Sequence, residues 1–334
     1  MALSVTPFGP EHLFAAAELL AARHRVARAL FPGLPARYME AAAAREVIAS
    51  IAEEALARHG AGGVAALDGG RLTGYLLGEY HIGAPYGASR LALVSYVGHA
   101  VDPACTFDTV RALYAALAPL WNDNGCHGHY VSPAAWDGEL LAAWRSLGFG
   151  AHHTRGMRDT APVGGSAPRD LRFRAATADD ARLVGDLVTR LARHHTDAPV
   201  WDPFTEERAT ADRATVVERL ADPTITYWLA ERAGRVLGTI ALSPPRPYAA
   251  MLAPDRGIHI DEAYVEPEAR GEGAGTALLD WALECARDAG LEWCTVSWAP
   301  HNISAARFWT GHGFRPTMQR VARIVDPRIA WSPT

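Results

Sequence analysis

The stretch EARGEGAGTALL, residues 268–279, has three glycines at alternate positions behind a single arginine. The apolar residues that follow predict a helix, and GIHIDEAYV, residues 257–265, predicts a strand that Pro267 helps to end. The first amides of a helix have no internal partners, and the helix dipole adds partial positive charge there. Glycine removes side chains and permits positive φ. The spacing therefore predicts a loop that holds a phosphate or pyrophosphate.

Two common phosphate loops do not fit this stretch. A Walker loop requires Gly-Lys-Ser/Thr, and the chain contains no lysine. A dinucleotide fingerprint requires G-x-G-x-x-G in a parallel βαβ unit, whereas this spacing is G-x-G-x-G after a hairpin-like strand order.

The pattern YVEPEARGEGAGTALL, with Arg270, Gly273 and Gly275, instead resembles the coenzyme A pyrophosphate loop of the GNAT (Gcn5-related N-acetyltransferase) superfamily. A second element, HNISAARFWTGHGF at 301–314, resembles the later segment of that family, in which an Asn opens a helix that ends in a Gly-Phe turn. Asn302 is a suitable N-cap. The resemblance covers residues 171–325 by these motifs.

The resemblance implies direct transfer of an acetyl group from acetyl-CoA to an amine. It implies that the end of the strand, the loop amides and the later helix bind the cofactor. The residues assigned to the cofactor in this way are Ala263, Tyr264, Val265, Arg270, Gly271, Glu272, Gly273, Ala274, Gly275, Thr276, Asn302, Ala305, Phe308 and Trp309.

The amine must lose a proton to attack, so a catalytic base is expected. The candidates on the strand before the loop are Glu262 and His259, followed by Asp261, and the family often uses an acidic residue there. Strand alternation predicts that His259 and Asp261 share a face with Val265, and that Glu262 lies on the opposite face.

The group that would protonate the leaving thiolate of the cofactor differs from the family pattern. Many members have a Tyr five residues before the Phe of the Gly-Phe turn, and this chain has Trp309 there. An indole N–H does not titrate near neutral pH. Either another group, such as Tyr264, Ser297 or His312, or water supplies the proton, or the site does not catalyse the usual reaction.

The chain repeats itself at an offset of 164 or 165 residues. The matching pairs are DGGRLTGYLLG at 68–78 with RAGRVLGTIAL at 232–242, HAVDP at 99–103 with AYVEP at 263–267, and AAWRSLGF at 142–149 with RFWTGHGF at 307–314. The repeat predicts two tandem GNAT-fold domains of mixed α/β type, each with a mostly antiparallel sheet. The predicted domains are residues 1–160 and 171–334, and the Pro/Gly/Ser-rich stretch APVGGSAPRD, 161–170, is the predicted linker.

The first copy is predicted to be a degenerate, non-catalytic domain that packs against the second. It has no glycine between Pro103 and Tyr114, so a pyrophosphate would meet side chains there. Asp137 occupies the place of Asn302, and its carboxylate would repel an anionic cofactor.

The composition is typical of a soluble globular protein. The 334 residues are 49% hydrophobic and 21% charged, with a net charge of −5, which argues against general nucleic-acid binding. No signal peptide or membrane span is recognised, so a cytoplasmic protein without a membrane partner is expected. The four cysteines lack zinc-site spacing, and no metal is expected.

Two other functions remain open. A non-catalytic acyl-CoA sensor or partner protein would keep the same loop, and Trp309 favours it. The arrangement of two tandem domains with a degenerate first domain also resembles mycothiol synthases. This resemblance implies a cysteinyl amine as an alternative acceptor.

Overall fold

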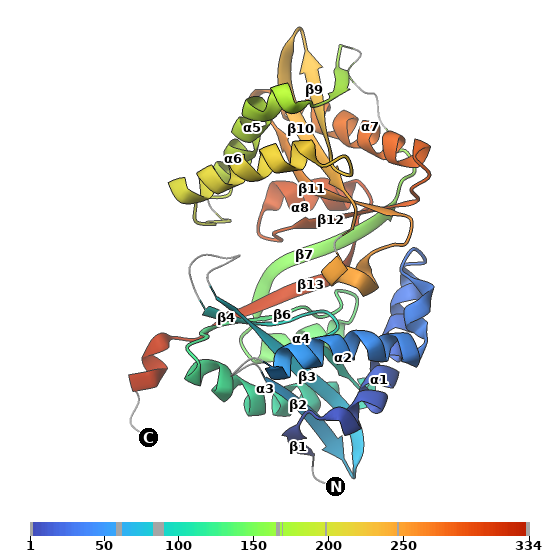
Figure 1. The fold of residues 1–334 in the computed structure, drawn as a ribbon, viewed down its shortest axis with the longest axis vertical. Coiled ribbons are helices and arrows are strands. Elements are labelled where there is room, and N and C mark those ends of the chain that lie inside the picture. The colour runs from blue at the N-terminus through green and yellow to red at the C-terminus, as the bar shows by residue number, and fades with distance from the viewer. Residues whose placement is uncertain are drawn as a thin grey trace. The chain divides into compact units, whose positions relative to one another are not determined.

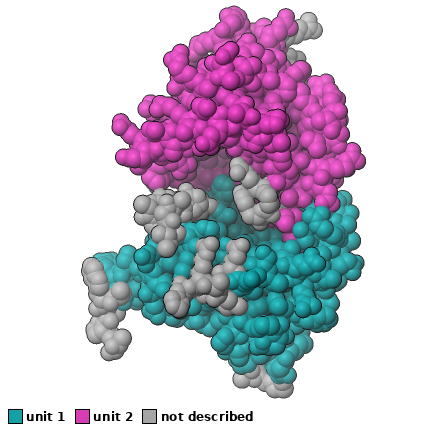
Figure 2. All heavy atoms as spheres, viewed as in Figure 1, with its two compact units in different colours: residues 1–154, 316–334 teal, residues 155–315 magenta. Residues whose placement is uncertain are grey.

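The computed structural model describes residues 3–57, 62–82, 90–164, 168, 170–197, 199–245 and 247–331. The chain forms two compact units, residues 1–154 with 316–334 and residues 155–315 (Figure 2). Among the described helices, none combines the length and the apolar composition needed to cross a bilayer.

The first unit is built from strands β1 (Ser4–Pro7), β2 (Gly62–Asp68), β3 (Arg71–Ile82), β4 (Arg90–Val94), β5 (His99–Val101), β6 (Gly128–Val131) and most of β13 (Arg315–Ile324), with helices α1 (Leu13–Leu30), α2 (Ala41–Ala57), α3 (Thr106–Asp123) and α4 (Gly138–Ser146) (Figure 1). The second unit contains β8 (Arg172–Ala175), β9 (Thr226–Arg232), β10 (Arg235–Ser243), β11 (Gly257–Val265) and β12 (Trp293–Trp298), with α5 (Ala181–His194), α6 (Glu206–Ala221), α7 (Ala274–Asp288) and α8 (Ile303–Gly311). Strand β7 (Gly150–Asp159) contains the boundary between the units.

The strands of the two units have the same pairing pattern. In the second unit β8, β9, β10 and β11 pair antiparallel in that order, and β11 pairs parallel with β12. In the first unit β1, β2, β3 and β4 pair antiparallel, and β4 pairs parallel with β6. The predicted mixed α/β fold with a mostly antiparallel sheet is confirmed.

The matching hairpins of the repeat have matching turns. Gly69 and Gly70, between β2 and β3, have φ of 57° and 84°. Ala233 and Gly234, between β9 and β10, have φ of 50° and 79°. Two successive positive φ values characterise the tight turn whose twist suits a two-residue hairpin. The repeat therefore extends from sequence to backbone conformation.

The unit boundaries differ from the predicted ones. Strand β13 belongs mainly to the first unit, where Val321 to Ile324 pair antiparallel with β6 and Val321 is buried in the core. The second unit begins at Arg155, within β7. Part of the predicted linker also packs on α7, because the Val163 amide donates to Asp280 at 2.8 Å. Residues 165–167 and 169 of that linker lie outside the described residues.

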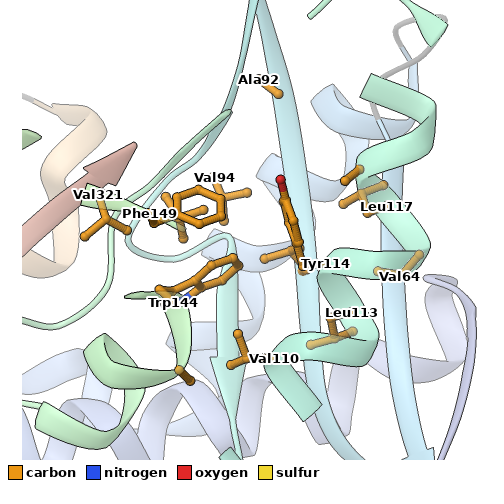
Figure 3. Close-up of a cluster of buried hydrophobic side chains, with 14 of the residues drawn as sticks. Val64, Ala92, Val94, Val110, Leu113, Tyr114, Leu117, Trp144, Phe149 and Val321 are labelled. Atoms are coloured by element: carbon orange, nitrogen blue, oxygen red, sulfur yellow. The ribbon is translucent and has the colours of Figure 1, made fainter. Parts of the chain in front are cut away.

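The core of the first unit surrounds Tyr114 on α3. Figure 3 shows Tyr114, Trp144 and Phe149 together in this cluster, and their rings meet edge-on with centroids 5.0–6.0 Å apart. The Tyr114 hydroxyl lies 2.8 Å from Nδ1 of His129, whose Nε2 lies 2.9 Å from the Cys126 carbonyl. A carbonyl only accepts, so Nε2 carries the ring proton and Nδ1 accepts from Tyr114. Burial lowers the pKa of His129 to about 4, which keeps the ring neutral.

Replacing Tyr114 with phenylalanine is expected to lower the free energy of unfolding by about 1–3 kcal/mol, because it leaves a buried acceptor on His129 unpaired. Urea unfolding would measure this change. Tyr80→Phe is the matched control, since the Tyr80 hydroxyl makes an exposed hydrogen bond to Leu120 O at 3.3 Å. Equal losses in both variants would contradict the assignment.

The second unit has a core on each face of its sheet. One core joins α7 and α8 to Ile240 and Ile260. The other joins α5 and α6 to Ala241 and Tyr264. These two clusters define the α7 face and the α5–α6 face of the sheet.

Candidate functional site

The glycine stretch forms a bare turn at the start of α7. Gly273 is the N-cap of α7 with φ of 83°, and Gly271 has φ of 77°. A Cβ on Gly275 would lie 3.4 Å from the Phe308 ring and 3.6 Å from Val265. The missing side chain at Gly275 thus lets the first turn of α7 approach Phe308 and Val265 closely. The predicted strand, glycine turn and helix N-terminus are confirmed.

Arg270 and Glu272 in this turn are engaged by their neighbours. Arg270 Nε donates to the Val265 carbonyl at 2.8 Å, and its guanidinium lies 5.5 Å from the centre of the Tyr264 ring. The Glu272 carboxylate accepts from Arg232 at 2.7 Å.

A contact between helices that the sequence did not predict fixes the first turn of α7. Thr276 Oγ1 lies 3.0 Å from His312 Nε2, and His312 Nδ1 lies 2.6 Å from the Phe308 carbonyl. In the neutral ring Nδ1 therefore carries the proton, and Nε2 accepts from the threonine hydroxyl. His312 thus joins the end of α8 to the glycine turn.

The start of α8 supplies an amide side chain. Asn302 is buried, and its Oδ1 accepts from the Ala305 amide at 3.1 Å, which confirms the predicted N-cap. Within the described part of the chain, no hydrogen bond to its Nδ2 is found. Trp309, by contrast, is buried in the α7-face core, edge-on to Phe308 and Phe314 at 4.9 and 5.3 Å. Ala263, Ala305 and Phe308 pack against the same core.

Strands β11 and β12 diverge beside these groups. Their parallel register runs from Gly257 opposite Trp293 to Ile260 opposite Val296. Strand β11 continues to Val265 along β10 only. Backbone groups of a strand point alternately to its two sides, so Asp261 to Val265 present amides and carbonyls on the side away from β10.

A β-bulge in β11 overturns the predicted side-chain directions. Glu262 pairs with Ala241 and Ile260 with Leu242, so Asp261 is an extra residue. Ile260 accordingly packs on the α7 face, whereas Tyr264, an even number of residues later, packs on the α5–α6 face. The prediction that Glu262 lies opposite Asp261 is wrong, because a bulge interrupts alternation.

The bulge brings two carboxylates to one arginine and one tyrosine. Arg219 of α6 donates to Asp261 at 2.7 Å and to the Tyr227 hydroxyl at 2.9 Å. Tyr227 in turn donates to Glu262 at 2.7 Å. Side-chain exposure is 8% for Asp261 and 11% for Arg219, so this ion pair is nearly buried.

The two carboxylates have different environments. Burial raises the pKa of Glu262, against the opposing effects of Arg219 and the hydrogen bond from Tyr227. Asp261 instead has the direct ion pair with Arg219. Neither Arg219 nor Tyr227 was identified from sequence. The register of the strands could have indicated Tyr227 as a neighbour of Glu262. Ala241 on β10 pairs with Tyr227 on β9 and with Glu262 on β11.

His259 is held by β12. Its Nδ1 lies 2.8 Å from Thr295 Oγ1, and it is only 7% exposed. Thr295 also bonds to the Ile258 carbonyl and to Arg155. The ring is thereby fixed within the sheet, before the bulge that carries Asp261 and Glu262.

The corresponding place in the first unit has a different structure. The strand is interrupted between β4 and β5, and His99 is 1% exposed with Nε2 3.3 Å from the Ser132 carbonyl. Burial lowers the pKa of His99 to about 3. Before α3, Asp102 caps the turn and pairs with Arg71 at 2.6 Å. Asp102 corresponds in the repeat to Glu266, so the difference lies in the buried imidazole of His99 at the place of Ala263 and in the interrupted strand.

Comparisons with known proteins agree with this geometry. The model of the acetyltransferase (GNAT) family matches residues 192–314. An aminoalkylphosphonate N-acetyltransferase from Salmonella typhimurium is 31% identical over 155 residues, which are 46% of this chain and 90% of that enzyme.

Solved structures are similar over the whole chain. A GCN5-related N-acetyltransferase from Sphaerobacter thermophilus has a TM-score of 0.60 at 16% identity, covering 96% of this chain and 95% of that one. A tandem GNAT protein from the clavulanic acid biosynthesis pathway has a TM-score of 0.51 at 16% identity, covering 98% and 99%. At these identities the likeness shows the fold, which is that of two tandem domains.

Proposed function

Because the chain belongs to the acetyltransferase (GNAT) family, we propose that it transfers an acetyl group from acetyl-CoA to the primary amine of a small molecule, at a site in the second unit. The strongest support is the glycine turn at the N-terminus of α7, beside the point where β11 leaves β12. Such a turn suits an anionic pyrophosphate, and the free strand edge suits an amide-containing arm.

The residues present fit coenzyme A. Gly271 and Gly273, with φ of 77° and 83°, place no side chain beside the loop amides, and a Cβ on Gly271 would meet no atom within 4 Å. The amides from Gly271 to Thr276 are assigned to the pyrophosphate, and Asn302 Nδ2 to the pantetheine arm. When bound, acetyl-CoA supplies an acyl group activated as a thioester.

Glu262 is the best placed of the three candidate bases. Its raised pKa makes it a better proton acceptor near neutral pH than Asp261, which is neutralised by Arg219. Tyr227 orients the Glu262 carboxylate, and Arg219 holds Tyr227. His259 is engaged with Thr295 and is assigned a structural role.

Trp309 is assigned to packing and not to proton transfer. It is buried among aromatic rings, and an indole N–H does not titrate near neutral pH. Acyl transfer would release the thiolate of coenzyme A, and its proton is therefore assigned to water, while Glu262 would take the proton of the amine. Free backbone amides of β11 beyond Asp261 are positioned to stabilise negative charge on a carbonyl oxygen.

The acceptor is expected on the α5–α6 face, where Asp261 and Glu262 point. The relative from Salmonella typhimurium acts on aminoalkylphosphonates by name, so these belong in a substrate panel with amino sugars and cysteinyl amines. An acyl-CoA sensor would have the same turn and differ only in lacking turnover.

Calorimetry with acetyl-CoA, followed by free-thiol release across this amine panel, tests the function. About one cofactor bound per chain, with thiol release for at least one amine, is the expected result. Binding without release for any amine would favour the sensor. Absence of binding would overturn the cofactor assignment itself.

A further inference from the structure

The residue directly after β11 is a buried glutamate that no cofactor assignment includes. Glu266 is 5% exposed. Its amide donates to the Leu237 carbonyl at 2.8 Å, and its own carbonyl accepts from Ala269 at 2.9 Å. Glu266 is therefore both the last residue held by β10 and the first residue of the turn that leads to the loop.

The Glu266 carboxylate joins three elements. Its Oε1 pairs with Arg190 of α5, and its Oε2 accepts from the Tyr264 hydroxyl at 3.2 Å. Burial, together with the Glu266 charge, raises the pKa of Tyr264, so the phenol remains a donor. The other side of Tyr264 is covered by Arg270, which also bonds to Val265 O.

These contacts form a continuous path from α5 to the glycine turn. Arg190 holds Glu266, Glu266 holds Tyr264, and Arg270 rests on Tyr264 at the first position of the loop. A charge-assisted pair with a nearly buried carboxylate is strong, and loss of one partner leaves the other charge unpaired. The position of the loop therefore depends on Arg190.

A pocket of about 420 Å³ opens over this pair and is lined by Leu183, Asp186, Leu187, Arg190, Gly234, Arg235, Val236 and Glu266. The Arg190 side chain is 52% exposed, whereas the Glu266 side chain is 7% exposed. Arg190→Met keeps an aliphatic side chain of similar length at this half-exposed position, and water can reach the carboxylate through the pocket. The variant is expected to fold.

We propose, on the premise of the function proposed above, that Arg190 and Glu266 are positioning residues that fix the end of β11 and so hold the loop amides for coenzyme A. The pair contributes to cofactor affinity and not to the chemical step. It touches neither the cofactor-facing amides nor the carboxylates at the bulge.

Calorimetry of acetyl-CoA binding to the full chain tests this role. Arg190→Met is expected to raise Kd roughly tenfold, which corresponds to about 1.4 kcal/mol. Arg190→Lys, which keeps the charge, is expected to recover part of the affinity. With an acceptor from the panel, KM for acetyl-CoA should rise in Arg190→Met while kcat stays unchanged.

Arg235→Met is the matched control. Arg235 lines the same pocket and pairs with Glu268, but both side chains are exposed, at 64% and 51%, so this pair is worth little. Its Kd should stay within about twofold of wild type. Wild-type Kd in Arg190→Met, or equal weakening by Arg235→Met, would overturn the positioning role while leaving the proposed function intact. Absence of binding to wild type would overturn both.

Discussion

Replacing Gly273 with glutamate is expected to weaken acetyl-CoA binding by roughly 100-fold or more, because it places a carboxylate at the start of α7 where an anion is proposed to bind. The residue caps α7 with φ of 83°, which side chains rarely adopt. Repulsion and a displaced backbone both act against the pyrophosphate. Calorimetry at constant ionic strength measures the loss.

Gly290→Glu is the matched control for this variant. Gly290 follows α7 with φ of 78° and is exposed, so the substitution adds a similar backbone strain and the same charge at the opposite end of the helix. Wild-type affinity is expected for Gly290→Glu. Comparable losses in both variants would mean that strain in α7, and not an anion site, explains the effect.

Replacing Glu262 with glutamine is expected to reduce kcat by roughly 10²–10⁴-fold, the usual contribution of a positioned general base. Cofactor affinity should be unchanged, because the side chain points to the α5–α6 face and the glycine turn does not contact it. Thiol release at saturating acetyl-CoA, together with calorimetry, separates the two quantities.

The dependence of activity on pH provides a second test of Glu262 as the base. A base must be deprotonated to act, so wild-type activity should fall as pH drops through the Glu262 pKa. Burial raises that pKa above the ordinary glutamate value of 4.5, so the acidic limb should lie above that value. Asp261→Asn is the comparison, since it removes a carboxylate of the same bulge. If Asp261→Asn abolished the acidic limb and Glu262→Gln kept it, the assignment of the base would be reversed.

Local sequence was sufficient for the glycine turn, the hairpins and the cap at Asn302. Each depends on a few adjacent residues whose type determines which backbone conformations they adopt. The positive φ values of Gly271 and Gly273 are an example. The order of elements in the two copies followed from the same local signals.

The sheet face to which each candidate base points could not be predicted from local sequence. The bulge at Asp261 depends on how β10 and β11 align, and it reverses the alternation that the sequence alone predicts. Arg219 and Arg190 reach the site from α6 and α5, so their roles depend on helix packing. The sequence also could not predict that β13 joins the first unit, because the sequence pattern of a strand does not depend on which strands it pairs with.

The location of β13 has a consequence for synthesis of the protein. Strand β6 pairs with residues 321–324, which the ribosome adds almost 200 residues after β6 itself. Until they emerge, one edge of β6 has no partner, and unpaired edges invite association with other chains. The N-terminal half cannot complete its sheet during its own translation. Its maturation therefore waits for the synthesis of β13.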